Sequence, residues 1–178
     1  EKAMTKVYID GSAGTTGLRI RERLAARGDI QVLEIPEKER KDPQARGERI
    51  NESDITFFCL PDAAAIAAEA LVANPKVRII DTSTAHRTAP DWSYGFAELS
   101  PAHRQSLAQS KRVSVPGCHA SGFNALVYPL IAGGIAGADY PFVCYSVTGY
   151  SGGGKQMIAE YGAPERDGEL DSPRQYGV

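Results

Sequence analysis

A single cysteine, Cys118, stands between an apolar segment and a segment that can form a helix, in the sequence VSVPGCHASGFNAL (residues 113–126). A free cysteine is often a small buried hydrophobe. At the first turn of a helix, however, unpaired backbone N–H groups lower the pKa of a thiol and favour the nucleophilic thiolate. From position alone both interpretations of Cys118 are open.

The three histidines of the chain do not supply a convincing partner for this thiol. His119 adjoins Cys118, but consecutive helical residues point about 100° apart, so its ring cannot be assumed to face the sulfur. His103 lies in a polar segment predicted as a helix and is expected to face solvent. His86 lies in a loop and is expected to hydrogen-bond locally. We therefore predict that part of the active site lies outside this chain.

A second group of residues that could do chemistry is D-G-S-A-G-T-T-G, residues 10–17, between a predicted strand and a predicted helix. Glycines at every third position permit a tight turn and let a pyrophosphate approach the positive N-terminus of the helix. A tight turn without a ligand is the alternative, and glycine spacing alone discriminates weakly. Because strand, helix and second strand follow in the expected order, we predict a dinucleotide site that includes Gly11, Ser12, Gly14, Thr15, Thr16 and Gly17.

The residues after the second predicted strand bear on which dinucleotide binds. Glu34 stands near the position at which an acidic residue would bind the ribose 2′-hydroxyl of NAD. It is followed by a cationic cluster, Lys38, Arg40 and Lys41, which suits the 2′-phosphate of NADP. A solvated loop explains this cluster equally well. We favour NADP, with Lys38 as a candidate contact.

Two further segments could bind anions. T-G-Y-S-G-G-G-K, residues 148–155, offers backbone amides, Ser151 and Lys155 at the start of a helical run. It lacks the P-loop spacing, and a flexible turn is equally compatible. The guanidinium of Arg87 matches two oxygens of a carboxylate or phosphate, although a single arginine is more often a surface residue.

The composition indicates a globular protein. The chain has 178 residues, of which 42% are hydrophobic and 24% charged, with a net charge of -2. Its cations are dispersed, which argues against nucleic-acid binding, and no apolar run reaches the roughly 20 residues that span a membrane. Three cysteines without close spacing argue against disulfides and a metal site, and we expect Cys59 and Cys144 in the core. We expect a cytoplasmic protein, since the N-terminal segment lacks the apolar core of a signal peptide.

Strand and helix patterns alternate, which predicts an α/β fold with a Rossmann-type doubly wound parallel sheet. The predicted strands are residues 6–10, 31–35, 54–60, 77–81, 113–115 and 141–148. The predicted helices are residues 15–27, 63–73 and 101–109, a run from about 118, and a short run at 155–160. Residues 36–53 are predicted as a loop with room for a short helix. Pro129 is expected to kink or end the helix that contains it.

The strand predicted at residues 141–148 could begin a second sheet. Fewer than about 35 residues follow it, too few to complete a second layered domain, so either the strand joins the first sheet or the chain is a piece of a longer protein, and we favour the second alternative. We therefore expect the N-terminal part of a longer protein. The predicted domains are an NADP-binding domain, residues 1–116, and the incomplete beginning of an α+β catalytic domain, residues 117–178.

In combination, the motifs resemble those of the N-acetyl-γ-glutamyl-phosphate reductases of arginine biosynthesis, in their shorter form. They are G-S-A-G-T-T-G (11–17), F-F-C-L-P-D-A-A-A (57–65), D-T-S-T-A-H-R (81–87), Y-G-F-A-E-L (94–99), V-P-G-C-H (115–119) and T-G-Y-S-G-G-G-K (148–155). The combination is specific, whereas each motif alone is not.

The resemblance implies a Rossmann NADP-binding domain joined to an α+β domain shared with aspartate-semialdehyde and glyceraldehyde-3-phosphate dehydrogenases. It implies that Cys118 is the nucleophile, that Arg87 contacts the substrate phosphate, and that Ser151 and Gly152 contact substrate. Family members continue beyond the position that matches Val178, and the resemblance places their acid–base histidine there. It also implies a homo-oligomer for the complete protein.

The implied reaction is the NADPH-dependent reduction of N-acetyl-γ-glutamyl phosphate, an acyl phosphate, to N-acetylglutamate 5-semialdehyde through a cysteinyl thioester. Two alternatives are a related acyl-phosphate reductase of the aspartate- or aminoadipate-semialdehyde type, and a nucleotide-binding fragment without catalytic activity.

Overall fold

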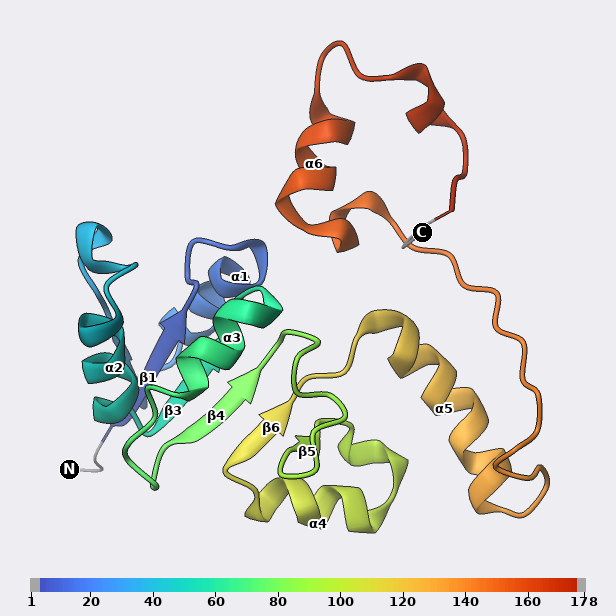
Figure 1. The fold of residues 1–178 in the computed structure, drawn as a ribbon, viewed down its shortest axis with the longest axis horizontal. Coiled ribbons are helices and arrows are strands. Elements are labelled where there is room, and N and C mark those ends of the chain that lie inside the picture. Colours follow the sequence, from blue (N-terminus) through green and yellow to red (C-terminus); the bar gives the residue numbers. More distant parts are fainter. Residues whose placement is uncertain (1–3, 176–178) are drawn as a thin grey trace. The chain divides into compact units, whose positions relative to one another are not determined.

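The computed structural model describes residues 4–175. The chain forms two compact units, Glu1–Val143 and Cys144–Val178, and each is described by itself (Figure 1). Within residues 4–175, no helix is long and apolar enough to cross a membrane.

The first unit is built on a six-stranded sheet in which all paired strands are parallel. The strand order is β2 (Ile30–Leu33), β1 (Thr5–Asp10), β3 (Ile55–Phe58), β4 (Arg78–Asp81), β6 (Arg112–Ser114) and β5 (Ser93–Tyr94). The chain passes from β1 to β2 and then crosses to β3 on the other side of β1. This reversal is the switch point at which such sheets bind ligands, and the predicted Rossmann-type α/β fold is confirmed.

Three helices connect the first four strands: α1 (Thr15–Ala25), α2 (Pro43–Glu52) and α3 (Asp62–Glu69). Because parallel crossovers are right-handed, the reversal at β1 places α1 and α2 on opposite faces of the sheet. Helices α2 and α3 lie side by side (Figure 1). Helix α4 (Pro101–Gln109) precedes β6, and α5 (Cys118–Ala132) follows it.

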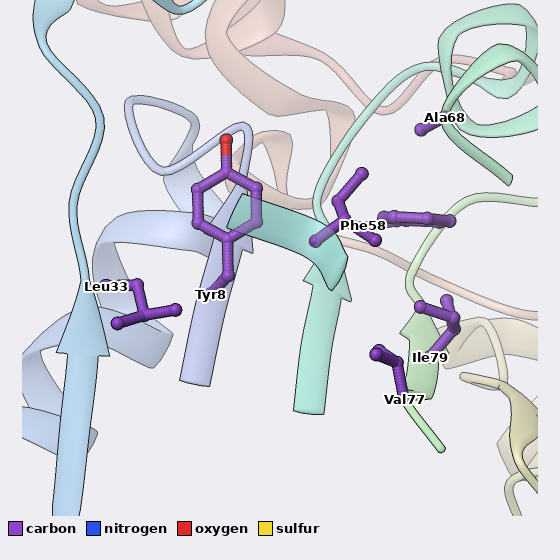
Figure 2. Close-up of a cluster of buried hydrophobic side chains, with 7 residues drawn as sticks. Tyr8, Leu33, Phe58, Ala68, Val77 and Ile79 are labelled. Atoms are coloured by element: carbon purple, nitrogen blue, oxygen red, sulfur yellow. The ribbon is translucent and has the colours of Figure 1, made fainter. Parts of the chain in front are cut away.

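The hydrophobic core lies where α2 and α3 cover the sheet. Tyr8 of β1, Leu33 of β2, Phe58 of β3 and Ile79 of β4 lie across neighbouring strands (Figure 2). The buried cluster is completed by Ile50 of α2, Ala68 of α3 and Val77. Apolar side chains on neighbouring strands thus hold the sheet and these two helices together, and position the loops at the sheet's edge.

The last residues of four strands form a buried row at the carboxyl edge of the sheet. The register pairs Asp10 with Phe58, Phe58 with Asp81, and Asp81 with Ser114. All four are at most 3% exposed. Two of them are carboxylates, which need partners because an isolated buried charge is costly. Residues from α2 and from the loop after β4 supply these partners.

The strand predicted at residues 141–148 is wrong for this structure. Residues 141–149 have no regular secondary structure, and Val143, Tyr145 and Val147 are 97%, 92% and 81% exposed. Alternating apolar residues form a strand only when a partner strand covers them. The described residues provide no such partner.

Two helices also differ from the prediction. Helix α2 occupies part of the segment predicted mainly as loop, and Pro129 lies inside α5. That helix ends at Ala132, where the Gly133 N–H donates to the Pro129 carbonyl (2.9 Å). The proline therefore precedes the helix end by about one turn instead of ending it at once.

The second unit contains the 3₁₀ helix η3 (Tyr150–Gly153), helix α6 (Gly154–Gly162) and the 3₁₀ helix η4 (Gly168–Asp171). Tyr150 stacks on Tyr161 at 4.9 Å. The predicted domain boundary between residues 116 and 117 concerns a complete catalytic domain and stays a prediction.

Candidate active site

The glycine-rich turn after β1 has the tight geometry that the sequence predicts. Gly11 has φ +86°, and a Cβ there would lie 2.2 Å from the Cys59 carbonyl oxygen. Only glycine fits both conditions. The Gly14 N–H donates to the Gly11 carbonyl (2.9 Å), and the buried Gly17 packs against the same carbonyl. The turn therefore lies directly against the end of β3.

The first turn of α1 leaves its backbone amides available. Its N-cap is Gly14, and no side chain within residues 4–175 caps this end. The N–H groups of the first turn, which includes Thr15, Thr16 and Gly17, have no intrahelical partner. Helix α2, in contrast, is capped by Asp42, which accepts from two backbone N–H groups. The start of α1 thus fits the pyrophosphate of a dinucleotide.

A cleft of about 420 Å³ opens beside the turn, within the usual size of small-molecule sites. Gly11, Ser12 and Ala13 line it on one side, and the cations Arg40, Lys41 and Arg46 also line it. The side chain of Lys38 is 83% exposed, near Glu39, and does not line this cleft. Contact of Lys38 with a cofactor stays a prediction, whereas Arg40 and Lys41 of the same cationic cluster are placed at the cleft.

An ion pair, Asp10–Arg46, forms part of the cleft wall. The Arg46 guanidinium donates to both Asp10 carboxylate oxygens, with Nη2–Oδ2 at 2.8 Å. The side chain of Arg46 is only 14% exposed, and that of Asp10 is 4% exposed. Burial, together with the charge of Asp10, raises the pKa of Tyr8, which also lines the cleft, well above its usual range. The phenol of Tyr8 is therefore neutral across the physiological range.

Arg46 is a site residue that the sequence reasoning missed. A signal for its helix was present: Asp42 precedes Pro43, and an aspartate N-cap followed by proline is a common helix start.

Glu34, the candidate for the ribose 2′-hydroxyl, is ion-paired with Arg21 of α1. The pair uses Oε1, and the Glu34 side chain is 67% exposed.

Cys118 is the first residue of α5, and it is exposed. Its N-cap is Gly117, and in the part of the chain that the structure describes no side chain caps this helix. Ser121 turns inward and donates to the Gly117 carbonyl (2.9 Å). The structure therefore places Cys118 at an open helix N-terminus, outside the core.

Arg87 lies against the residue that precedes this cysteine. Its Nε donates to the Val115 carbonyl (3.1 Å), and a Cβ at Gly117 would lie 2.6 Å from its Nη1. A side chain at position 117 would displace the guanidinium. Two residues singled out separately in the sequence, Arg87 and Cys118, thus meet at one helix end.

The other two cysteines differ from Cys118. Burial raises the pKa of the partly buried Cys59 thiol to about 11, although a hydrogen bond from Thr82 lowers it in part. This fits the expected structural role of Cys59. Cys144 was expected in the core, which is wrong: it is exposed at the start of the second unit, because the predicted strand around it does not form.

The histidines are also placed. His86 bonds locally, as predicted, through Nδ1 to Asp81 Oδ2 (2.7 Å). The expectation that His103 faces solvent is wrong, since its Nδ1 bonds Ser100 Oγ (2.8 Å) and its ring packs edge-on against Tyr128.

In the second unit, Ser151 and Gly152 lie in η3 and Lys155 lies in α6, so these residues meet around one helix start. Their contact with substrate stays a prediction.

The chain is similar in sequence to known proteins. The family model of the semialdehyde dehydrogenase NAD-binding domain matches residues 34–107. An N-acetyl-gamma-glutamyl-phosphate reductase 2 from Pseudomonas putida is 51% identical over 158 residues, 89% of this chain and 50% of that protein. An N-acetyl-gamma-glutamyl-phosphate reductase from Rhizobium meliloti is 48% identical over 169 residues, 94% of this chain and 54% of that protein.

Solved structures agree on the fold. An aspartate semialdehyde dehydrogenase from Francisella tularensis has a TM-score of 0.61 at 16% identity, over 88% of this chain and 48% of that chain. The Candida albicans aspartate semialdehyde dehydrogenase with NADP has a TM-score of 0.53 at 16% identity, over 74% and 48%. The chain spans about half the length of the curated relatives it matches. About half of the aligned residues of this chain are identical to those of N-acetyl-gamma-glutamyl-phosphate reductases, to which it is similar over most of its own length.

Proposed function

We propose that this chain holds the cofactor cleft and the nucleophile of an enzyme that reduces N-acetyl-γ-glutamyl phosphate to N-acetylglutamate 5-semialdehyde with NADPH. One observation carries the proposal: the exposed Cys118 stands at an open helix N-terminus with the Arg87 guanidinium against the preceding residue. A thiol nucleophile beside a phosphate-binding cation is what cleavage of an acyl phosphate requires.

The first step uses only residues of this chain. The Cys118 thiolate attacks the acyl carbonyl carbon, a C–S bond forms, and the C–O bond to phosphate breaks, so that phosphate leaves beside Arg87. Backbone N–H groups at the start of α5 stabilise the tetrahedral oxyanion, an effect worth roughly 3 kcal/mol per donor in measured enzymes. The product of this step is a thioester on Cys118.

When bound, NADPH supplies the hydride that reduces this thioester. The amides at the start of α1 hold the pyrophosphate, and Arg40 and Lys41, with Lys38 as the further candidate, hold the 2′-phosphate. From β1 to β6 there are three strand spacings, roughly 14 Å along the carboxyl edge. A dinucleotide that starts at α1 can therefore extend toward Cys118.

The remaining features are proposed from the similarity to these reductases. Ser151 and Gly152 are candidate contacts for the substrate, which is a small-molecule acyl phosphate. The acid–base histidine lies outside this chain. The complete enzyme is expected to be a cytoplasmic homo-oligomer.

The test is a Cys118→Ser variant of a protein of full family length that contains this sequence. Mixed with acyl phosphate and no NADPH, the unsubstituted enzyme should release one phosphate per active site in a burst, because the thioester accumulates. The variant should show no burst, while its Kd for NADPH stays within about twofold. A burst that survives the substitution would refute the thioester mechanism.

The same burst assay separates the alternatives. Aspartyl and aminoadipyl phosphates, offered in place of N-acetyl-γ-glutamyl phosphate, should give bursts at least tenfold slower. A faster burst with either one would assign the enzyme to that substrate. NADPH binding without a burst for any acyl phosphate would leave a nucleotide-binding protein.

A further inference from the structure

The side chain of His86 is held on three sides, although the proposed chemistry does not use it. It is 6% exposed. Its Nδ1 contacts Asp81 Oδ2 at 2.7 Å, and its Nε2 contacts Glu69 Oε2 at 3.1 Å. Its ring stacks on Trp92 with centroids 4.1 Å apart and planes within 7° of parallel. A buried residue with this many polar and ring contacts has a fixed orientation.

These contacts fold the loop after β4 back onto the sheet. Asp81, fully buried at the end of β4, also accepts from the Ser83 N–H (2.9 Å) and from Ser83 Oγ (2.6 Å). The bonds of His86 to Asp81 and Glu69 act as a clamp on this loop. At the outer end of the clamp, Glu69 of α3 also accepts from Arg112 Nε (3.3 Å). His86 therefore bridges the carboxyl end of one strand to a neighbouring helix. The loop can move only if these bonds break.

Arg87 directly follows His86 in the chain. Holding His86 in place therefore restricts the directions in which the Arg87 guanidinium can point. Thr84, earlier in the same loop, is tied to Asp62 at the start of α3. With the loop held in this way, Arg87 reaches across to the Val115 carbonyl and lies beside Gly117. The bond from Arg87 Nε to Val115 would by itself leave the rest of this long side chain free to turn.

We propose that His86 is a positioning residue: bonded to Asp81 and Glu69, it fixes the guanidinium of Arg87 against the N-terminus of α5, where the phosphate of the substrate binds. This inference rests on the proposed function of Arg87. His86 is too buried to reach the anion, so its effect on phosphate runs through Arg87. Substituting His86 therefore weakens the positive field at Cys118 without removing a charge from that site.

The test measures the charge that Cys118 experiences, and it needs no catalytic turnover. Anionic iodoacetate and neutral iodoacetamide alkylate the same thiol, and the ratio of their rates, divided by the ratio for free glutathione, reports nearby positive charge. Rates at Cys118 are read by peptide mass spectrometry. Arg87→Ala should lower the ratio about fivefold, as expected for loss of a cation a few ångströms away at a protein surface.

His86→Phe keeps a ring on Trp92 and removes both ring nitrogens, and it should lower the ratio at least twofold. His86→Asn, whose side-chain amide can still donate to Asp81, should recover part of the loss. In an Arg87→Ala background His86→Phe should change nothing further, because both substitutions act through one guanidinium. The Kd for NADPH shows that each variant is folded. If His86→Phe does not bind NADPH, Glu69→Ala removes the outer bond of the clamp at a partly exposed position.

The matched control is His103→Asn, which breaks a local histidine bond next to α5 and should leave the ratio unchanged. An unchanged ratio in His86→Phe, with a lowered ratio in Arg87→Ala, would overturn the positioning role alone. An equal drop in His103→Asn would also overturn it, since general loosening of α5 would then be the cause. An unchanged ratio in Arg87→Ala would refute the anion site of the proposed function itself.

Discussion

At the scale of single residues, the surroundings of each sulfur separate the three cysteines. Cys118 is exposed at a helix start, Cys144 is exposed in an irregular segment, and Cys59 lies partly buried behind the glycine turn. From sequence position alone both interpretations of Cys118 were open, and Cys144 was expected in the core. Exposure decides which thiols a reagent can reach, and the pKa decides which are ionised.

We expect iodoacetamide at pH 7.5 to label Cys118 and not Cys59. Burial raises the pKa of the Cys59 thiol from its ordinary value of 9.0 to about 11, so this thiol stays protonated and unreactive at neutral pH. Its labelling should begin only as the pH rises toward 11. Peptide mass spectrometry gives the labelled fraction of each cysteine, and rapid labelling of Cys59 at pH 7.5 would contradict the burial seen here.

Gly11→Ala should destabilise the first unit by at least about 2 kcal/mol and abolish NADPH binding. The new methyl group would overlap the Cys59 carbonyl oxygen, and alanine is also strained at a φ of +86°. Urea unfolding and an NADPH titration measure the two effects. Gly28→Ala is the matched control, because a Cβ there meets nothing within 4 Å. Equal stability of the two variants would show that the turn can relax.

At the scale of elements, two helices without a side-chain cap carry the candidate site and a capped helix supports it. The N-caps of α1 and α5 are Gly14 and Gly117, and both helices offer their first backbone amides to ligands. Helix α2 has its own cap, and its Arg46 satisfies the buried Asp10 at the end of β1. The ion pair therefore joins α2 to the cleft, and the loop that carries Arg40 and Lys41 leads into this helix.

Arg46→Met should cost about 3 kcal/mol of stability and weaken NADPH binding. The substitution keeps an apolar stem but leaves the Asp10 carboxylate buried without its partner, which is strongly destabilising. Arg27→Met is the matched control: the side chains of the Arg27–Asp29 pair are both 57% exposed, and exposed ion pairs add little to stability. Denaturant unfolding compares the two, and similar losses would mean that Asp10 finds another partner or water.

At the scale of the whole molecule, the chain divides into a layered unit around the parallel sheet and a smaller unit around α6. Residues 144–149, between the sheet unit and η3, have no regular secondary structure, and the side chains of Tyr145 and Val147 are exposed. Such a segment lacks the backbone pairing that protects a chain from proteases. The first unit, in contrast, buries its core within its own elements.

Brief treatment with chymotrypsin should therefore cut first next to Tyr140, Phe142 or Tyr145. Tyr140 and Tyr145 are 58% and 92% exposed. The large fragment should keep its Kd for NADPH within about twofold, because the cleft lies wholly in the first unit. Mass spectrometry identifies the cuts. Initial cleavage between residues 4 and 139, or loss of NADPH binding with the first cut, would contradict this division.

Features that depend on neighbouring residues could be predicted from the sequence: the alternation of strands and helices, the glycine turn after β1, and a helix start near Cys118. Capping preferences, the freedom of glycine and the period of apolar residues are local, so they can be predicted without a fold. The motifs were enough to indicate which proteins the chain resembles.

Contacts between distant residues depend on the folded chain and could not be predicted in this way. The tertiary structure brought Arg46 to Asp10, His86 to Glu69, and Arg87 to Gly117, and it left residues 141–148 without a partner strand. Side-chain partners far apart in the chain are set by the packing of helices onto the sheet. A strand exists only where another strand pairs with it, so an apolar alternation cannot show whether that partner is present.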